Sequence, residues 1–307
     1  MTDLSYSPPV LAKCTDRNVR SLEHPQLGGP DIWLGELQKT LSNHICASFD
    51  FFVDWSCDPI RVAHELWFKF PVQSQKSLRS IDSEIMLRVL RENRNFVDLA
   101  KICNGMDLKA RAVLFIDNSD FNDDTDVVFF DYDGDTGEAK FEFSNLKKLK
   151  ERIKTLSGGP VRIGAKGLMF GTTKLECFLS STDALWPGDA DLVVYSKQEK
   201  KISCIFEFKK HTRNAKAKFE DQSVDLYYPS PDGRKYNRLL ALAGSFVEPI
   251  PIFAVFYCNY EGERSIIIEE IEKRPKGLGV VRRFSVDSLK TPNDVAVELA
   301  RLITPVP

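Results

Sequence analysis

The pattern of apolar and polar positions predicts a chain of intermingled helices and strands. Apolar residues spaced three and four positions apart indicate helices in the segments 31–41, 80–106, 145–156, 235–246 and 291–303. Short apolar or alternating runs typical of strands occur at residues 48–55, 112–117, 126–133, 139–144, 190–208, 251–259 and 265–286. This mixture predicts an α/β fold, with an N-terminal α+β region followed by a mixed β-sheet core flanked by helices.

Proline and glycine divide the chain into three parts. Residues 1–28 are polar and contain "SPP" and "LGGP", which indicates an irregular lead-in. A chain of 307 residues is long for one compact domain. The candidate boundary is Gly158-Gly159-Pro160, so we expect an N-terminal α+β region over 29–157 and a second domain over 158–307. No internal repeat is evident.

Composition indicates a folded protein outside the membrane. The chain is 43% apolar and 28% charged, and no apolar run approaches the ~18 residues of a membrane span. Its first residues lack the features of a signal peptide. The seven cysteines form no CxxC pair and lie near no histidine at zinc spacing. We therefore expect reduced thiols in a cytoplasmic protein, without a Cys/His metal site.

The net charge of −2 hides two segments of opposite sign. Residues 117–142 carry ten acidic side chains against the single Lys140, and residues 197–218 carry eight basic side chains against Glu199 and Glu207. A polyanion would be attracted to the second segment and repelled by the first. A protein partner for residues 117–142 is one possible role of the acidic segment.

The most strand-like segment is "PGDADLVVYSKQEKKISCIFEFKK", residues 187–210. A turn centred on Glu199 would pair Tyr195 with Ser203 and set Asp191 opposite Glu207. Because side chains alternate along a strand, Asp191, Glu207 and Lys209 would share one face. The opposite face would be apolar, formed by Leu192, Val194, Cys204, Phe206 and Phe208.

Two carboxylates on opposed strand positions lie about 4.5–5.5 Å apart at Cβ and repel each other unless a cation neutralises them. Mg²⁺ suits such a pair because it prefers carboxylate and water oxygens. Mn²⁺ is a possible substitute. A bound metal ion can polarise a phosphate, and Lys209 could orient a water molecule or stabilise developing negative charge.

This hairpin resembles the Asp…Glu-x-Lys signature of the PD-(D/E)xK nuclease superfamily. "GDADLVV" provides the aspartate before an apolar strand, and "CIFEFKK" provides an apolar strand that leads into Glu207-Phe208-Lys209. The resemblance implies a restriction-endonuclease-like core, with Asp191 and Glu207 as metal ligands and Lys209 as the catalytic lysine. It further implies an Mg²⁺-dependent endonuclease that acts on DNA rather than RNA, in restriction, defence or repair.

Some members of the superfamily add a carboxylate from a preceding helix, and the candidates here are Glu176 and Glu151. Glu176 is the nearer and is taken as an outer metal ligand. Asp189, after Pro187-Gly188, is a rival to Asp191. A Gln-x-x-x-Tyr pattern is missed by one position at Gln222.

Basic residues after the hairpin could follow a phosphate backbone. The candidates for nucleic-acid binding are Lys210, Arg213, Lys216, Arg234, Lys235 and Arg238. The alternative for this segment is an ordinary solvated helix face. A homodimer is also possible.

Two other functions remain open. The first is a non-catalytic nucleic-acid-binding or assembly module that retains the nuclease fold. The second is a regulatory protein that acts through residues 117–142. Within that segment, "DYDGDTGEAKFE" places Asp131, Asp133, Asp135 and Glu142 at calcium-loop spacing, but Thr136 stands where glycine is required. We therefore expect a hairpin there.

Overall fold

The computed structural model describes residues 4–117, 120–163, 167–230, 232–246, 248–275 and 277–304. The chain folds into two compact units, each built from two segments. Unit 1 comprises Met1–Ser21 and Phe49–Asp189, and unit 2 comprises Leu22–Ser48 and Ala190–Pro307. This division differs from the ranges 1–28, 29–157 and 158–307 expected from the sequence, because residues 22–48 belong to unit 2 and residues 158–189 belong to unit 1.

Unit 2 contains a mixed sheet whose strands follow one another in chain order: β10 (Gly188–Ser196), β11 (Lys201–His211), β12 (Ile252–Cys258), β13 (Ile266–Arg274) and β14 (Gly277–Val286). β11 and β12 are parallel, and every other neighbouring pair is antiparallel. The parallel pair requires a crossover connection. Helix α6 (Gly233–Ala243) lies in that connection.

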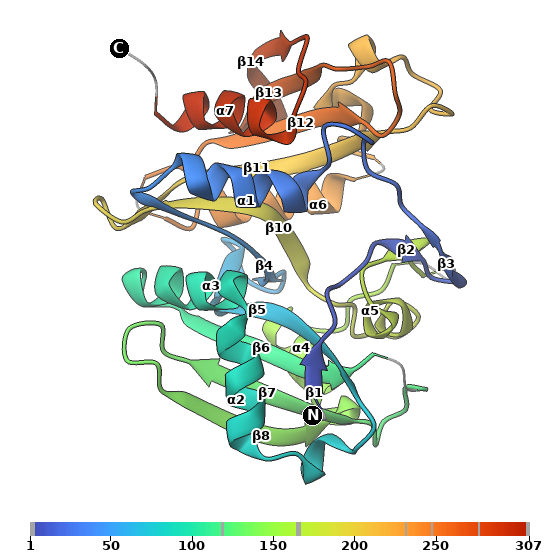
Figure 1. Ribbon diagram of the computed structural model, residues 1–307, viewed down its shortest axis with the longest axis vertical. Coiled ribbons are helices and arrows are strands. Elements are labelled where there is room, and N and C mark those ends of the chain that lie inside the picture. The colour runs from blue at the N-terminus through green and yellow to red at the C-terminus, as the bar shows by residue number, and fades with distance from the viewer. Residues whose placement is uncertain are drawn as a thin grey trace. The chain divides into compact units, whose positions relative to one another are not determined.

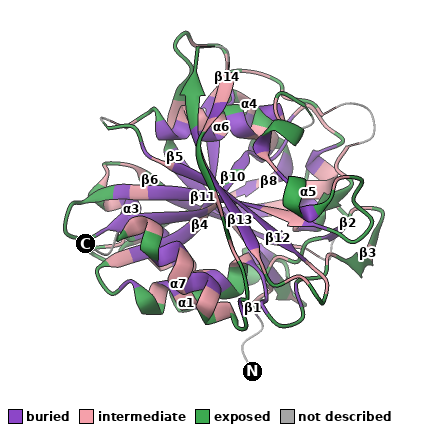
Figure 2. Ribbon diagram, turned by 90° about the horizontal axis from the view of Figure 1, so that it is seen from above, coloured by how far each residue is buried: buried purple, intermediate pink, exposed green. Residues whose placement is uncertain are grey.

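One face of this sheet is covered by α1 (Pro30–Thr40) and α7 (Pro292–Ile303), which lie side by side (Figures 1 and 2). Trp33 of α1 packs on Phe208 and Tyr257, at ring-centroid distances of 5.5 and 4.8 Å. α7 begins at a capping box formed by Thr291 and Asp294. The other face lies toward α6, whose Tyr236 and Leu239 are fully buried.

The strands of unit 1 pair in the order β4 (His44–Asp54, in unit 1 from Phe49), β5 (Arg61–Ser74), β6 (Lys109–Ile116), β7 (Asp126–Tyr132) and β8 (Ala139–Asn145), within the same large mixed sheet. Strand β1 (Leu4–Tyr6) also pairs with β5. Helices α2 (Ser83–Glu92) and α3 (Arg94–Gly105) connect β5 to β6 and cover one face, where Phe96 contacts Phe68. The opposite face packs against α4 (Leu146–Leu156) and α5 (Lys174–Leu179).

The two units share one connectivity. In each, five consecutive strands pair as antiparallel, parallel, antiparallel and antiparallel, with helices between the second and third strands and after the fifth. The fold is therefore repeated although no internal repeat is evident in the sequence. Apolar alternation is common to all half-buried strands, so it carries no signal of which strands correspond.

Three short strands of unit 1 form a separate sheet: β2 (Ala12–Lys13), β3 (Asp16–Arg20) and β9 (Phe170–Gly171). Pairing of β2 with β9 brings Cys14 beside α5, where it forms a disulfide with Cys177 at a Cα–Cα distance of 5.4 Å. The expectation of reduced thiols is wrong for these two cysteines. They lie 163 residues apart, so no local spacing could have indicated the bond.

Of the helices that the structure describes, none combines the length and apolarity that a bilayer crossing requires.

Candidate functional site

The β10–β11 hairpin has the predicted register over its central positions. Leu192 pairs with Phe206, and Val194 pairs with Cys204. Continued toward the open end, this register sets Asp191 opposite Glu207. A bulge after Val194 shifts the pairing near the turn, so that Tyr195 pairs with Ile202 rather than with Ser203 as expected.

The predicted division into two faces is confirmed. The apolar residues of the hairpin belong to the core under α1 and α7: Leu192, Val194, Cys204, Phe206 and Phe208. Asp191, Glu207 and Lys209 alternate with them and therefore point to the opposite face, toward α6. Glu207 is 0% exposed, so its carboxylate depends on neighbouring cations for compensation.

Five charged side chains meet on this face, and we call them the Glu207 cluster: Asp191, Glu207, Lys209, Asp232 and Lys235. The Lys235 Nζ lies 2.9 Å from Glu207 Oε2 and 3.3 Å from Asp191 Oδ1. The Lys209 Nζ lies 3.1 Å from Glu207 Oε1 and 2.7 Å from Asp232 Oδ2. Three carboxylates thus alternate with two ammonium groups.

The backbone also orients this cluster. Asp191 Oδ2 accepts a hydrogen bond from the Phe208 amide at 2.8 Å, which fixes the carboxylate against β11. Asp232 immediately precedes α6, and Lys235 lies in its first turn. The sequence pattern assigned neither residue to the site as a charge partner of the hairpin. Their proximity depends on where α6 packs.

Aromatic rings surround the Lys209 ammonium. Its Nζ lies 5.4 Å from the ring centroids of both Tyr227 and Tyr236. The Tyr227 hydroxyl donates a hydrogen bond to Gln222 Oε1 at 2.6 Å. Gln222 and Tyr227 are thus in contact, although their spacing departs from the Gln-x-x-x-Tyr pattern by one position.

The charge state of Lys209 follows from its neighbours. Burial alone would lower the pKa of its ammonium, but Glu207 and Asp232 raise it, and the net shift is upward. Lys209 therefore stays protonated through neutral pH and can act as a fixed positive charge, not as a general base. Burial, with Glu207 and Asp232, also raises the pKa of the Tyr236 hydroxyl, which stays neutral.

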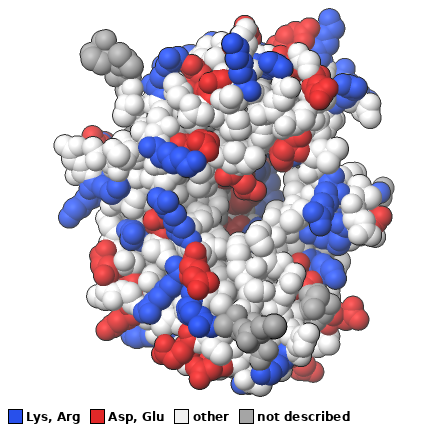
Figure 3. Space-filling view, viewed as in Figure 1, with Lys and Arg blue, Asp and Glu red and all other residues white. Residues whose placement is uncertain are grey.

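The basic residues expected to bind nucleic acid differ in accessibility. Arg213, Lys216 and Arg234 are exposed, and Arg238 is half-buried. Lys210 forms an ion pair with Glu23 and donates to the Leu22 carbonyl at 3.0 Å. Lys235 belongs to the Glu207 cluster. On the face drawn in Figure 3, basic and acidic side chains are interspersed rather than gathered into one basic patch.

Glu176, the expected outer metal ligand, is a residue of unit 1. Its Oε2 accepts hydrogen bonds from the backbone and hydroxyl of Thr172 and lies 3.8 Å from Lys69 Nζ. Lys69 Nζ also lies 3.4 Å from Asp50 Oδ1. We call Asp50, Lys69 and Glu176 the Lys69 cluster. Asp189, the alternative to Asp191 as a metal ligand, interacts electrostatically with the Lys69 cluster, because its charge raises the pKa of Asp50.

Asp50 makes the stability of unit 1 depend on pH. Burial raises its pKa to about 7, although Lys69 opposes the shift. A raised folded-state pKa contributes stability that is complete below about pH 4 and is lost as pH rises through about 7. At about 1.4 kcal/mol per pKa unit, the loss is on the order of 4 kcal/mol.

We therefore predict that Asp50→Asn removes this dependence. The free energy of unfolding is measured in urea at pH 5 and at pH 8 for both proteins. The difference between them, variant minus wild type, should be larger at pH 8 than at pH 5 by about 2–4 kcal/mol. Asp135→Asn is a suitable comparison, since Asp135 is exposed in the turn of the β7–β8 hairpin. A difference between Asp50→Asn and wild type that is independent of pH would contradict the prediction.

The corresponding sheet face of unit 1 is apolar. In unit 2 the face toward the crossover helix carries the Glu207 cluster. In unit 1 the face toward α2 and α3 carries Phe68, and Phe51 pairs with Leu66 in the same layer. All three side chains are buried. The repeated fold therefore does not repeat the charged site among the described residues.

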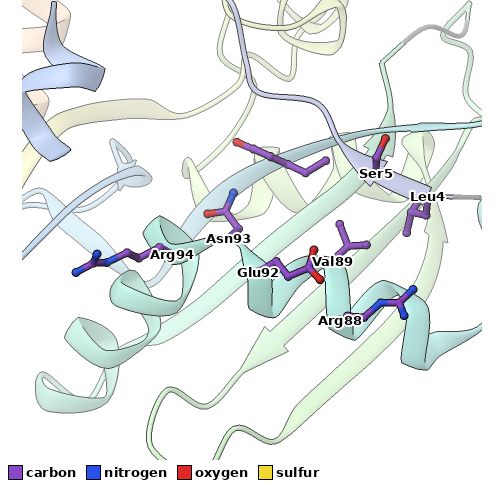
Figure 4. Close-up of a pocket in the computed structure, with 8 residues that line it drawn as sticks. Leu4, Ser5, Arg88, Val89, Glu92, Asn93 and Arg94 are labelled. Atoms are coloured by element: carbon purple, nitrogen blue, oxygen red, sulfur yellow. The ribbon is translucent and has the colours of Figure 1, made fainter. Parts of the chain in front are cut away.

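A pocket of about 640 Å³ lies elsewhere in unit 1, between β1 and the junction of α2 with α3 (Figure 4). Its charged lining residues are Arg88, Glu92 and Arg94. Asn93 also lines it but already caps α3 by accepting from the Phe96 amide at 3.0 Å. This mixture of charges indicates no particular ligand.

The acidic segment 117–142 is largely occupied by internal contacts in the part that the structure describes. Asp131 is held by Arg111 at 2.6 Å, and Asp133 accepts from the amides of Asp135 and Thr136. Strands β7 and β8 form the expected hairpin. Within the described ranges, no group of three or more His, Cys, Asp or Glu residues is placed to hold a metal ion, and this applies to the Glu207 cluster as well as to residues 131–142.

The chain was compared with family models, curated proteins and solved structures, and none of the three comparisons gave a match.

Proposed function

We propose that unit 2 is a metal-dependent nuclease of the PD-(D/E)xK type that hydrolyses phosphodiester bonds, with DNA as its substrate. The main support is that Asp191 and Glu207, from adjacent strands, converge on one cationic group. Their oxygens lie 3.3 and 2.9 Å from the same Lys235 Nζ. Lys209, two residues beyond Glu207, completes the pattern on the same face.

The donor set fits a hard divalent cation. Both Glu207 oxygens are buried and accept no hydrogen bond from a described residue, so ionic contacts alone compensate them. Mg²⁺ is commonly bound through one or two carboxylates, with water and substrate phosphate completing its shell. Asp191 and Glu207 would hold it. Glu176 is left out of this set because it belongs to the Lys69 cluster.

The residues of the cluster then take separate roles. A bound Mg²⁺ would supply Lewis-acid polarisation of the phosphodiester. Lys209 would direct its ammonium toward the water or the phosphate, where a fixed charge stabilises developing negative charge. Asp232 would be a positioning residue, because its contact holds Lys209. Arg213, Lys216 and Arg234 are the exposed cations available for the phosphate backbone.

One observation favours a second function. Lys235 neutralises Asp191 and Glu207 without a metal ion, as a structural ion-pair network would. A non-catalytic nucleic-acid-binding module would have the same contacts.

Incubation of the purified chain with supercoiled DNA, single-stranded DNA and RNA distinguishes the two functions. Each polymer is treated with Mg²⁺, Mn²⁺ or EDTA. The nuclease proposal expects cuts in DNA that need a divalent ion and stop with EDTA. Binding to DNA with no cleavage under any of these conditions would support the non-catalytic module instead.

A further inference from the structure

We infer that Lys235 is a built-in counter-cation, whose ammonium occupies the metal position in the ion-free protein and is displaced when a divalent cation binds. This inference rests on the proposed function, since it concerns the same carboxylates. It adds a residue that the Asp…Glu-x-Lys pattern does not contain. It also means that the Lys235 ammonium and a divalent cation from solution compete for the same two carboxylates.

The geometry distinguishes the two lysines. Lys209 contacts Glu207 on Oε1 and Asp232 on Oδ2. Lys235 contacts Glu207 on Oε2 and Asp191 on Oδ1, so its ammonium lies between the two carboxylates of the proposed metal pair. Asp191 and Glu207 would hold a divalent cation in competition with this ammonium.

The position of Lys235 permits an exchange. It stands in the first turn of α6, and its side chain is 27% exposed, whereas Glu207 is 0% exposed. An ammonium on a flexible four-carbon stem can move toward solvent without movement of the helix. Lys209 is more enclosed, at 13% exposed, with two tyrosine rings around its ammonium. Lys209 would therefore remain when Lys235 leaves.

Electrostatics explain why a resident cation is useful. Two carboxylates on opposed strand positions repel each other, and a buried one without a counter-charge is strongly destabilising. Lys235 provides that counter-charge before metal binds. The same contact must be broken during binding, so it lowers the apparent affinity for metal.

The test measures Mn²⁺ binding directly, by calorimetry or electron paramagnetic resonance, without any cleavage assay. We expect Lys235→Met to bind Mn²⁺ at least about tenfold more tightly than wild type, because the competing ammonium is gone. The matched control is Lys210→Met, which removes a similarly placed ammonium of β11 that pairs with Glu23 outside the cluster. It should bind Mn²⁺ as wild type does.

A second measurement uses the wild-type protein, in case Lys235→Met does not fold. Lysine acylation followed by mass spectrometry should show that Mn²⁺ increases the reactivity of Lys235 and leaves that of Lys210 unchanged. Unchanged affinity in Lys235→Met, or Lys235 reactivity that Mn²⁺ does not increase, would overturn the inference while leaving the metal site in place. If Glu207→Gln binds Mn²⁺ as well as wild type does, the proposed metal site and the inference both fail.

Discussion

Replacing Glu207 with glutamine is expected to lower the rate of metal-dependent cleavage by at least about 10³-fold, equivalent to roughly 4 kcal/mol of transition-state stabilisation. The substitution keeps the shape of the side chain but removes the charge that would bind the cation. Glu207 is the most enclosed member of the cluster and contacts both lysines. Its loss therefore affects the metal position and the orientation of Lys209 together.

No second site should sustain residual activity. Although unit 1 repeats the connectivity of unit 2, its face toward the crossover helices carries Phe51, Leu66 and Phe68 in place of charged groups. Cleavage by Glu207→Gln should therefore fall to the level seen with EDTA, measured as the rate of nicking of supercoiled DNA.

Glu269→Gln is the matched control for this variant. Glu269 is also buried, at 1% exposed, and it lies on β13 of the same unit. Its partners are Arg283 at 2.5 Å and the Val224 amide at 2.8 Å, outside the Glu207 cluster. This control should lose thermal stability but continue to cut. Equal loss of cleavage in the two variants, each shown to be folded, would mean that a buried carboxylate of this unit is needed only for structure.

Replacing Lys209 with methionine is expected to lower kcat by about 10²–10³-fold, the usual effect of removing one preorganised group that stabilises developing charge. Because Glu207 and Asp232 outweigh burial and hold the pKa of Lys209 above its ordinary value, the lysine stays charged. We therefore expect that deprotonation of Lys209 does not lower the cleavage rate at any pH below the range in which an ordinary lysine titrates. Stopped cleavage reactions between pH 6 and pH 9 measure both effects.

Lys69→Met provides the comparison in unit 1. Lys69 is as enclosed as Lys209, with each side chain 13% exposed, and it too contacts two carboxylates. Burial would lower the pKa of Lys69, but Asp50 and Glu176 raise it. If the site lies in unit 2, Lys69→Met should retain cleavage within a few-fold. A loss as large as that of Lys209→Met would assign the chemistry to the Lys69 cluster instead.

Local patterns predicted the parts of the fold in which neighbouring residues decide the outcome. The hairpin of residues 187–210 has the predicted register at its centre and the predicted two faces. The helices expected within 80–106 appear as α2 and α3, each with an Asp or Asn cap. Such features depend on the alternation of side chains and on capping, which are properties of adjacent residues.

Strand β5 shows where local patterns failed. It runs from Arg61 to Ser74 between β4 and β6, yet no strand was expected there. Leu66, Phe68, Phe70 and Val72 alternate as in a half-buried strand, but His64 interrupts this pattern and Pro71 is unfavourable within a strand. Pairing with β4, β6 and β1 compensates these residues, and none of those partners is visible from the segment itself.

The sequence alone determined that Glu207 and Lys209 share a face, because side chains two residues apart on a strand point the same way. Asp191 joins them through the pairing register, which sets Leu192 opposite Phe206 beyond the bulge. The tertiary structure decided what meets them. It brought Lys235 to the carboxylates and Asp232 to Lys209, placed Glu176 beside Lys69, and joined Cys14 to Cys177. These contacts depend on how helices and strands pack across long sequence separations, and packing has no local period from which it could be predicted.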